Sequence, residues 1–261
     1  MGKAMHLAVG AGLLASRIPL LGRLLDGLAS PGRVKAVTVP VGASIKAGPA
    51  VLPYDAARRL IESAGYILGL DSCMCRDSQG CRDYPHDLGC LFIGEGARKM
   101  AKSGMARQVS TAEALGRLER ARSLGLVTNL IWLRPELRVM GADPSRTVEM
   151  CFCCPCCCIA VKTKNGSKAF VDAITGLAVS RPVNPEACTR CTNCELGCPF
   201  KAIKVDLREG PVIDAERCKG CGRCELACKQ GVLKILPLDA AKGGGTLPGH
   251  AYLEEFFEMV R

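Results

Sequence analysis

The chain has few aromatic side chains and few histidines. Aromatic residues make up 4% of its 261 residues, with one tryptophan, and three histidines are present. Few aromatic rings leave little hydrophobic bulk for a core, so metal–thiolate bonds are expected to supply part of the stability. Three histidines and no recognisable nucleophile–histidine–acid set argue against a role that depends on general acid–base catalysis.

The sequence also lacks an apolar run long enough to cross a bilayer. The run at residues 4–15 holds twelve residues, whereas a membrane-spanning helix needs roughly twenty. Arg17, Pro19 and Arg23 interrupt any extension, and no small-residue cleavage site typical of a signal peptide follows. We expect a helix over Ile18–Leu28 with one buried side, and peripheral membrane contact through the N-terminal helix is the alternative. The side expected to be buried consists of Ile18, Leu21, Leu24, Leu25 and Leu28.

Cysteine, by contrast, is abundant, with 18 in the chain. So many thiols without an export signal are typical of a reducing compartment, and we therefore expect a cytoplasmic protein.

Eight of the cysteines form two identical motifs, thirty residues apart, each with the spacing C-x2-C-x2-C-x3-C. The first three thiolates of such a motif converge from one loop on an iron–sulfur cube, and in a duplicated arrangement the fourth completes the cube of the other half. The sequence therefore predicts two [4Fe–4S] clusters, whose sensitivity to oxygen indicates an anaerobic or oxygen-poor setting. The ligands predicted for one cluster are Cys188, Cys191, Cys194 and Cys228, and those for the other are Cys218, Cys221, Cys224 and Cys198.

These motifs resemble the bacterial-type two-cluster ferredoxins over residues 181–237. A zinc ribbon needs only four cysteines, and a disulfide framework requires an exported chain, so both are weaker interpretations. In such ferredoxins a proline follows the fourth cysteine of a motif, as Pro199 follows Cys198 here. The second motif differs, because Lys229 follows Cys228. A lysine there is expected to raise the potential of the neighbouring cluster.

The other ten cysteines lie upstream in two groups. The loop at residues 73–90 has the spacing C-x-C-x5-C-x8-C, which predicts a metal site for zinc or an iron–sulfur cluster, with free or redox-active thiols as the alternative. Residues 151–158 hold six cysteines, too many for one metal. Because exposed thiols oxidise and the loop has little apolar content, we expect the two groups to meet and share one further metal site. The first group is Cys73, Cys75, Cys81 and Cys90, and the second is Cys151, Cys153, Cys154, Cys156, Cys157 and Cys158. His86 is expected to be a surface side chain and not a ligand.

The chain is also similar to a family of anaerobe ferredoxin-domain proteins of uncertain role. The similarity covers residues 50–237 and rests on a C-x-C-Arg loop, a G-C-L-F-x-G stretch at residues 89–94, the cysteine-rich segment and the two C-terminal motifs. It implies a redox function without identifying a substrate. Adjacent cysteines are also found in disulfide-reductase subunits that hold unusual iron–sulfur clusters.

These patterns predict an α+β protein in which a cysteine-rich α/β domain precedes a ferredoxin-like domain with two halves related by a pseudo-two-fold axis. Strands are predicted at residues 34–41, 66–70 and 126–133, and helices at 54–64, 95–105 and 111–123. The domains predicted are an N-terminal apolar helix and strand (1–50), the cysteine-rich domain (51–178), the two-cluster domain (179–237), and a linker with an amphipathic helix (238–261) that packs on the body.

The formal net charge is +10, which bound clusters would lower because each is anionic with its four thiolates. Residues 95–138 hold nine Lys and Arg against four Asp and Glu, without interleaved aromatic residues, which favours an acidic redox protein as partner, or a solvated helical face, over nucleic acid. We therefore expect an electron-transfer protein that passes single low-potential electrons to or from a partner oxidoreductase. The alternatives are a subunit of a thiol/disulfide reductase that uses the upstream site and, less favoured, a metal-sensing DNA-binding regulator.

Overall fold

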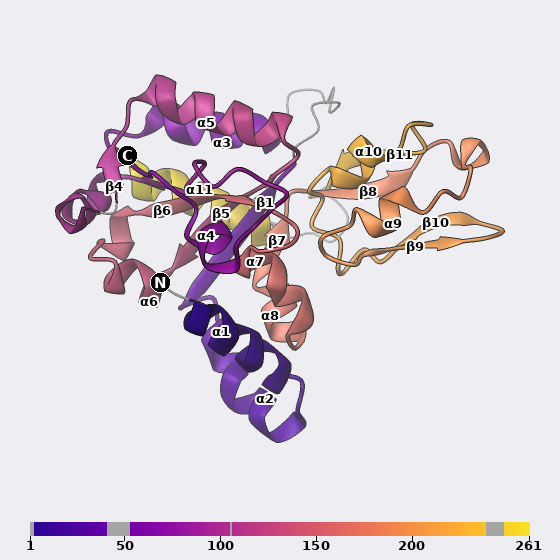
Figure 1. Ribbon diagram of the computed structural model, residues 1–261, viewed down its shortest axis with the longest axis horizontal. Coiled ribbons are helices and arrows are strands. Elements are labelled where there is room, and N and C mark those ends of the chain that lie inside the picture. Colours follow the sequence, from indigo (N-terminus) through magenta and orange to yellow (C-terminus); the bar gives the residue numbers. More distant parts are fainter. Residues whose placement is uncertain (1–2, 41–52, 105, 239–247) are drawn as a thin grey trace.

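The computed structural model describes residues 3–40, 53–104, 106–238 and 248–261. Its centre is a seven-stranded sheet with the strand order β4-β2-β3-β6-β5-β1-β7 (Figure 1). Neighbouring strands are antiparallel except β1 and β7, which run parallel. The strands span Val34–Val39 (β1), Ile67–Leu70 (β2), Leu91–Ile93 (β3), Ala106–Gln108 (β4), Val127–Leu133 (β5), Val148–Cys153 (β6) and Ile174–Gly176 (β7).

One face of this sheet is covered by three helices, α3 (Pro53–Ser63), α5 (Thr111–Ser123) and α11 (Pro248–Val260). Their apolar residues recur at helical spacing, and Leu60, Leu118 and Phe256 are completely buried against the strands. An ion pair between Lys35 of β1 and Glu255 also fixes α11. The C-terminal helix therefore docks on the body, as its apolar pattern predicts.

The opposite face of the sheet carries the cysteines. Alternate side chains of a strand point to the same face, so Glu149, Cys151 and Cys153 of β6 lie together. Helix α1 (Lys3–Ala15) covers this face and contacts α4 (Met74–Gln79) and α7 (Ile159–Lys162). A cavity of about 360 Å³ lies between α1 and strands β1, β5 and β6. The sheet thus separates an apolar core from a cavity lined by sulfur atoms.

Helices α1 and α2 (Pro19–Asp26) form a hairpin that projects from the body (Figure 1). The expectation that α2 buries one apolar side is wrong, because Leu24 is 77% exposed and Ile18 is 52% exposed. The close contact of α2 is made instead by Gly22, where a Cβ atom would lie 2.4 Å from the carbonyl oxygen of Ser16. Leu21 and Leu28 are also exposed, and Leu25 is half-buried.

The structure differs from the sequence prediction at two further places. Residues 95–105 were expected to form an α-helix, but Glu95–Ser103 is a 3-10 helix, which fits the tight approach of Gly96 to the backbone of Asp143. Strand β1 belongs to the same large sheet as the strands that follow residue 50. The domain boundary predicted at residue 50 therefore divides the strands of this sheet. The predicted end of β1 near Val41 and most of the predicted linker lie outside the described residues.

The C-terminal region begins where the chain leaves the large sheet after Leu177. Strand β8 (Ala178–Pro182) pairs antiparallel with β11 (Leu233–Pro237), and β9 (Ile203–Asp206) pairs antiparallel with β10 (Gly210–Ile213). Helices α9 (Asn193–Leu196) and α10 (Arg223–Ala227) contact each other. The mixture of helices and strands agrees with the α+β class expected. The remaining helices are α6 (Arg134–Val139) and α8 (Lys168–Asp172).

Candidate metal centres

Each predicted set of cluster ligands lines one hollow of the C-terminal region. One hollow is lined by Cys188, Cys191, Cys194 and Cys228. The other is lined by Cys198, Cys218, Cys221 and Cys224. The fourth cysteine of each motif therefore lies with the first three of the other motif. Each hollow presents the four thiols that a [4Fe–4S] cluster requires, so the residues fit the cofactor.

The two hollows differ in their surroundings. In the first, Cys191 is exposed and Cys188 is half-buried. In the second, Cys221 and Cys224 are buried, and Cys221 packs into the hydrophobic core that surrounds the large sheet. The first hollow therefore faces solvent, and the second adjoins the body of the protein.

Backbone N–H groups donate hydrogen bonds to sulfur atoms of the second hollow and so favour the thiolate form that binds metal. The backbone N–H of Ser180 donates to Cys218 Sγ at 3.4 Å, and that of Ala202 donates to Cys198 Sγ at 3.3 Å. Burial raises the pKa of Cys224 to about 12, so this thiol stays protonated at neutral pH unless a metal ion displaces the proton. Such donors also tune the potential of a bound cluster.

The backbone of the two motifs repeats in its unusual conformations. Three residues of the first half have a positive φ, and the residues thirty positions later are glycines that also have a positive φ. The pairs are Arg190 (58°) with Gly220 (62°), Thr192 (60°) with Gly222 (87°), and Lys201 (53°) with Gly231 (65°). Residues other than glycine rarely have a positive φ, so the repetition of these backbone conformations indicates that both loops need the same shape.

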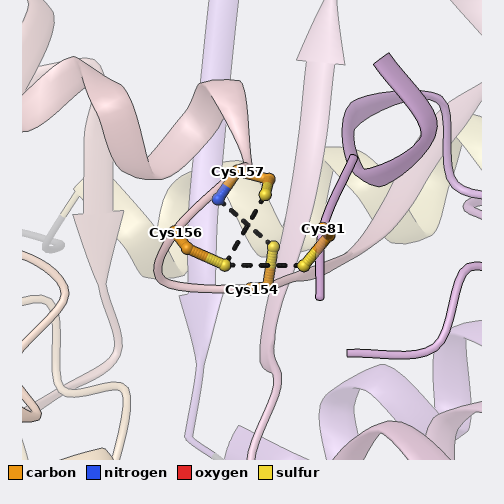
Figure 2. Close-up of side chains that lie close together, drawn as sticks. All are labelled: Cys81, Cys154, Cys156 and Cys157. Atoms are coloured by element: carbon orange, nitrogen blue, oxygen red, sulfur yellow. Dashed lines mark hydrogen bonds between the residues drawn. The ribbon is translucent and has the colours of Figure 1, made fainter. Parts of the chain in front are cut away.

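The upstream cysteines do meet in space, but they form three groups. In the first, Cys81 lies with Cys154, Cys156 and Cys157 (Figure 2), and their four Sγ atoms all lie within 4.8 Å of one another. We refer to these four residues as the tetrathiol group. Because Cys73, Cys75 and Cys90 lie elsewhere, the prediction that the loop at residues 73–90 forms one four-cysteine site is wrong.

The second group consists of Cys90, Cys151 and Glu149. The two sulfur atoms are 3.0 Å apart, and Cys151 Sγ donates to Glu149 Oε1 at 3.0 Å. All three residues are buried. Burial raises the pKa of Glu149, which favours the neutral carboxyl group beside the two thiols.

The third group consists of Cys73, Cys75, Cys153 and Cys158. Cys158 Sγ lies 2.9 Å from Cys153 Sγ, and the Cys75 side chain interacts with those of both Cys73 and Cys158. Asn129 of β5 donates its Nδ2–H to Cys153 Sγ at 3.1 Å. Hydrogen bonds from Cys151, Cys158 and Asn129 lower the pKa of Cys153 to about 7. This sulfur is therefore the thiolate candidate of the group.

A buried arginine organises the loop that carries Cys73, Cys75 and Cys81. The Arg76 guanidinium is completely buried and donates to the carbonyl oxygen of Leu88 at 2.5 Å and to that of Phe152 at 3.4 Å. His86 bridges Asp77 at 2.6 Å and the Cys81 carbonyl oxygen at 2.7 Å. These protein contacts help to hold the loop in its conformation. The spacing of the cysteines did not indicate Arg76, and only the C-x-C-Arg resemblance pointed to it.

The cavity beside α1 joins the second and third groups. Seven of the ten upstream cysteines line it, together with His6, Glu136 and Glu149. His6 Nδ1 is 2.9 Å from Ser78 Oγ, while its buried Nε2 has no hydrogen-bond partner among the described residues. Burial raises the pKa of Glu136 to about 8. These three polar residues come from distant segments, so no local pattern could have identified them.

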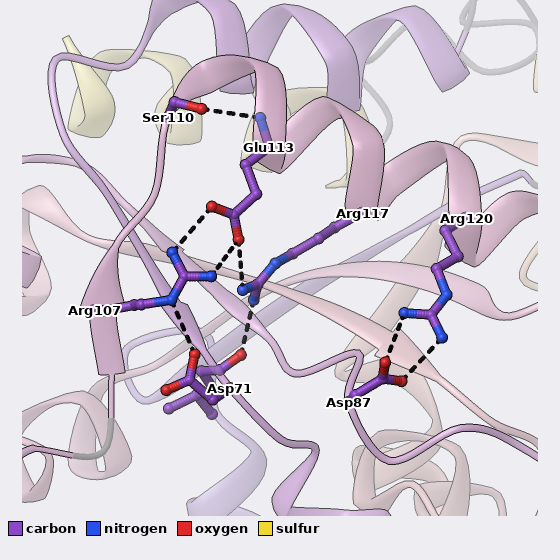
Figure 3. Close-up of polar contacts among 8 residues, drawn as sticks. Asp71, Asp87, Arg107, Ser110, Glu113, Arg117 and Arg120 are labelled. Atoms are coloured by element: carbon purple, nitrogen blue, oxygen red, sulfur yellow. Dashed lines mark hydrogen bonds and ion pairs between the residues drawn. The ribbon is translucent and has the colours of Figure 1, made fainter.

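The basic excess around α5 is largely paired with carboxylates (Figure 3). Arg107 binds Glu113 at 2.7 Å and Asp71 at 3.1 Å, and Arg120 binds Asp87 at 2.9 Å. Arg117 also binds Glu113. Ser110 caps the start of α5, since the Glu113 N–H donates to Ser110 Oγ at 3.1 Å. A helix whose arginines are engaged in this way offers little free positive charge to nucleic acid.

Comparison with known proteins identifies one region. Residues 187–233 match the family model described as a 4Fe-4S dicluster domain. No curated protein matches the chain. No helix within the described ranges has the length and apolar character needed to cross a membrane. The C-terminal region is therefore an iron–sulfur domain of the ferredoxin type, and it supports a role in electron transfer.

Proposed function

We propose that the protein transfers single electrons between redox partners through two [4Fe–4S] clusters held by residues 179–237. The observation that carries the proposal is the lining of the two hollows, in which each motif contributes three cysteines to one set and one to the other. When bound, such clusters take up and release one electron each at low potential. The repeated backbone conformations support two halves related by a pseudo-two-fold axis.

The surface around the first hollow supports docking of an acidic redox protein. Arg208 and Lys229 are exposed there, and Lys229 acts electrostatically on Cys191. Leu196 and Leu207 are each 81% exposed and flank the same loop, since Arg190 donates to the Leu207 carbonyl oxygen. Apolar side chains within a basic rim suit a transient interface with an acidic partner. This surface replaces α5 as the proposed docking site, because the α5 arginines are paired.

Paired substitutions test the exchange of the fourth cysteine. Replacing Cys191 with Ala should remove or damage one cluster, and adding Cys228→Ala should cause little further loss of iron because both residues serve the same set. Adding Cys198→Ala instead should damage both clusters, with a loss approaching twice that of the single variant. Iron and sulfide counts and the electron paramagnetic resonance spectrum of the reduced protein would measure this, starting from about eight iron atoms in the C-terminal region.

The opposite result would contradict the proposed ligand sets. If Cys191→Ala with Cys198→Ala damaged one cluster, and Cys191→Ala with Cys228→Ala damaged both, each motif would hold its own cluster. A protein without iron after anaerobic purification would contradict the electron-transfer role itself.

A second candidate function, reduction of a small disulfide, is favoured by the third cysteine group. Cys153 and Cys158 lie 2.9 Å apart at the wall of the cavity. The Cys153 thiolate would attack one substrate sulfur and release the first thiol. Cys158 would then attack Cys153 Sγ, release the second thiol and leave a Cys153–Cys158 disulfide. Two electrons from a low-potential one-electron donor protein that acts twice, with two protons, would restore both thiols.

Trapping of the mixed disulfide tests this candidate. A Cys158→Ser variant incubated with a small aromatic disulfide should gain the mass of one substrate half on Cys153, and Cys153→Ser should not. Cys191→Ser is the control outside the cavity, and it should behave like the wild type at Cys153. A Cys158→Ser protein that gains no adduct would exclude the attack by Cys153.

A further inference from the structure

The tetrathiol group draws together two distant parts of the chain. Cys81 follows α4, and the other three cysteines lie in the turn directly after β6 (Figure 2). Cys156 Sγ is 3.7 Å from Cys81 Sγ and 3.6 Å from Cys157 Sγ. All four sulfur atoms lie within 4.8 Å of one another. Four thiols thus converge on a single point.

These separations match a single tetrahedral metal ion. With zinc–sulfur bonds of about 2.3 Å, a regular tetrahedron places its sulfur atoms about 3.8 Å apart. In a [4Fe–4S] cluster each thiolate binds a different iron at a separate corner of the cube, so the four thiolates stand farther apart. A disulfide would join only two of the four sulfurs, at about 2.0 Å. The geometry therefore favours one ion over a cluster or a disulfide.

The backbone holds the four thiols in place. Cys154 and Cys157 have the C-x2-C spacing common among zinc ligands, with Pro155 in the turn between them. The backbone N–H of Cys157 donates to Cys154 Sγ at 3.4 Å, a contact that stabilises a thiolate bound to metal. Cys81 follows Gly80, whose left-handed conformation (φ 58°) ends α4, and the Cys81 N–H donates to the Arg76 carbonyl oxygen at 3.0 Å. The ligands are therefore largely preorganised.

We propose that Cys81, Cys154, Cys156 and Cys157 bind one Zn²⁺ ion as four thiolates. Four protein ligands leave no open position, which is typical of a structural site and not of a catalytic one. The ion would fasten the loop at residues 73–90 to the end of β6 and so fix one side of the cavity. The other six upstream cysteines remain outside this site. The proposal is independent of the clusters in the C-terminal region.

Metal analysis of the anaerobically purified chain tests the site. The wild type should contain about one zinc per chain besides the iron of its clusters. Cys81→Ser and Cys156→Ser should each lose that zinc while the visible absorption of the clusters stays unchanged. Cys90→Ser is the matched control, since it replaces an upstream cysteine of another group, and it should keep the zinc.

X-ray absorption at the zinc edge of the wild-type protein supplies a second readout that does not depend on variants folding. It should show four sulfur neighbours at about 2.3 Å and no neighbouring metal. Absence of zinc from the wild type, zinc retained in both Cys81→Ser and Cys156→Ser, or nitrogen or oxygen ligands in the spectrum would overturn the proposal. Iron bound in place of zinc at these four thiols would also overturn the assignment.

Discussion

At the scale of single residues, three residues other than glycine in the loops of the first motif have a left-handed backbone conformation. Lys201 has φ 53° where its counterpart Gly231 has φ 65°. No hydrogen bond of the described residues involves the Lys201 side chain, and a Cβ atom at Gly231 would meet no neighbour within 4 Å. Exchanging lysine and glycine at these two positions therefore measures the free-energy cost of the left-handed backbone alone.

Lys201→Gly should raise the free energy of unfolding of the cluster-loaded protein by about 1 kcal/mol, and Gly231→Lys should lower it by about the same amount. Denaturant unfolding followed by loss of the cluster absorption would measure both changes. Equal destabilisation by the two substitutions would show that the left-handed backbone is not strained at Lys201.

Glu136 provides a test of pH dependence at the same scale. Burial, followed by repulsion from Glu149, raises its pKa from 4.5 to about 8. The folded protein therefore keeps a proton that the unfolded chain loses above pH 4.5, so this residue stabilises the fold least at high pH. The contribution of Glu136 to the free energy of unfolding should decline steadily from about pH 5 to pH 8. Glu136→Gln should flatten this part of the stability profile and give a protein more stable than the wild type at pH 8. A profile unchanged by the substitution would contradict the raised pKa.

At the scale of elements, the hairpin of α1 and α2 exposes apolar side chains beside cations. Leu20 is 83% exposed and Leu24 is 77% exposed, and Arg17 and Arg23 lie next to them. Leucines next to arginines suit the surface of an anionic bilayer, where each buried leucine contributes about 1.5–3 kcal/mol. We propose peripheral binding of this hairpin to such a surface.

Cosedimentation with vesicles tests this binding. The wild type should bind phosphatidylserine-containing vesicles better than phosphatidylcholine vesicles, and the double variant Leu20→Ser, Leu24→Ser should bind at least about tenfold more weakly. Leu207→Ser, a change at an equally exposed leucine of the C-terminal region, is the control. A wild type that binds neither kind of vesicle would contradict the proposed membrane contact.

At the scale of the whole molecule, we expect the folding of the two parts of the chain to depend on metal to different extents. The large sheet packs against an extensive apolar core, whereas the separate core of the C-terminal region contains seven buried residues, two of them cysteines that line the hollows. So small a core is insufficient for stability without a covalent or metal cross-link.

Removal of iron by a chelator under reducing conditions should therefore unfold residues 178–237 while the large sheet stays folded. Hydrogen exchange should show lost protection in β9 and β10 and retained protection in β5 and β6. Reloading with iron and sulfide is the control and should restore protection. Protection of β9 and β10 that survives iron removal would show that this region folds without its clusters.

The sequence by itself predicted which cysteines line each hollow together, as well as strands β1, β2 and β5 and helices α3, α5 and α11. In each hollow three of the four cysteines come from one tight loop, and the thirty-residue repeat supplies the fourth, so the pattern in the chain corresponds directly to the two hollows. Helix α5 and strand β5 were predicted from local patterns of apolar residues, which act through near neighbours.

Only the tertiary structure decided how the ten upstream cysteines are sorted and what the apolar N-terminal residues contact. Which cysteines lie beside Cys81 depends on how its loop crosses the end of β6. The buried Arg76 sets that path, because it donates a hydrogen bond to the carbonyl oxygen of Phe152, 76 residues away. Periodicity likewise shows which side of α2 is apolar, but not whether anything covers that side. Contacts between residues so far apart in the chain leave no local pattern, because they arise only when the sheet brings the segments together.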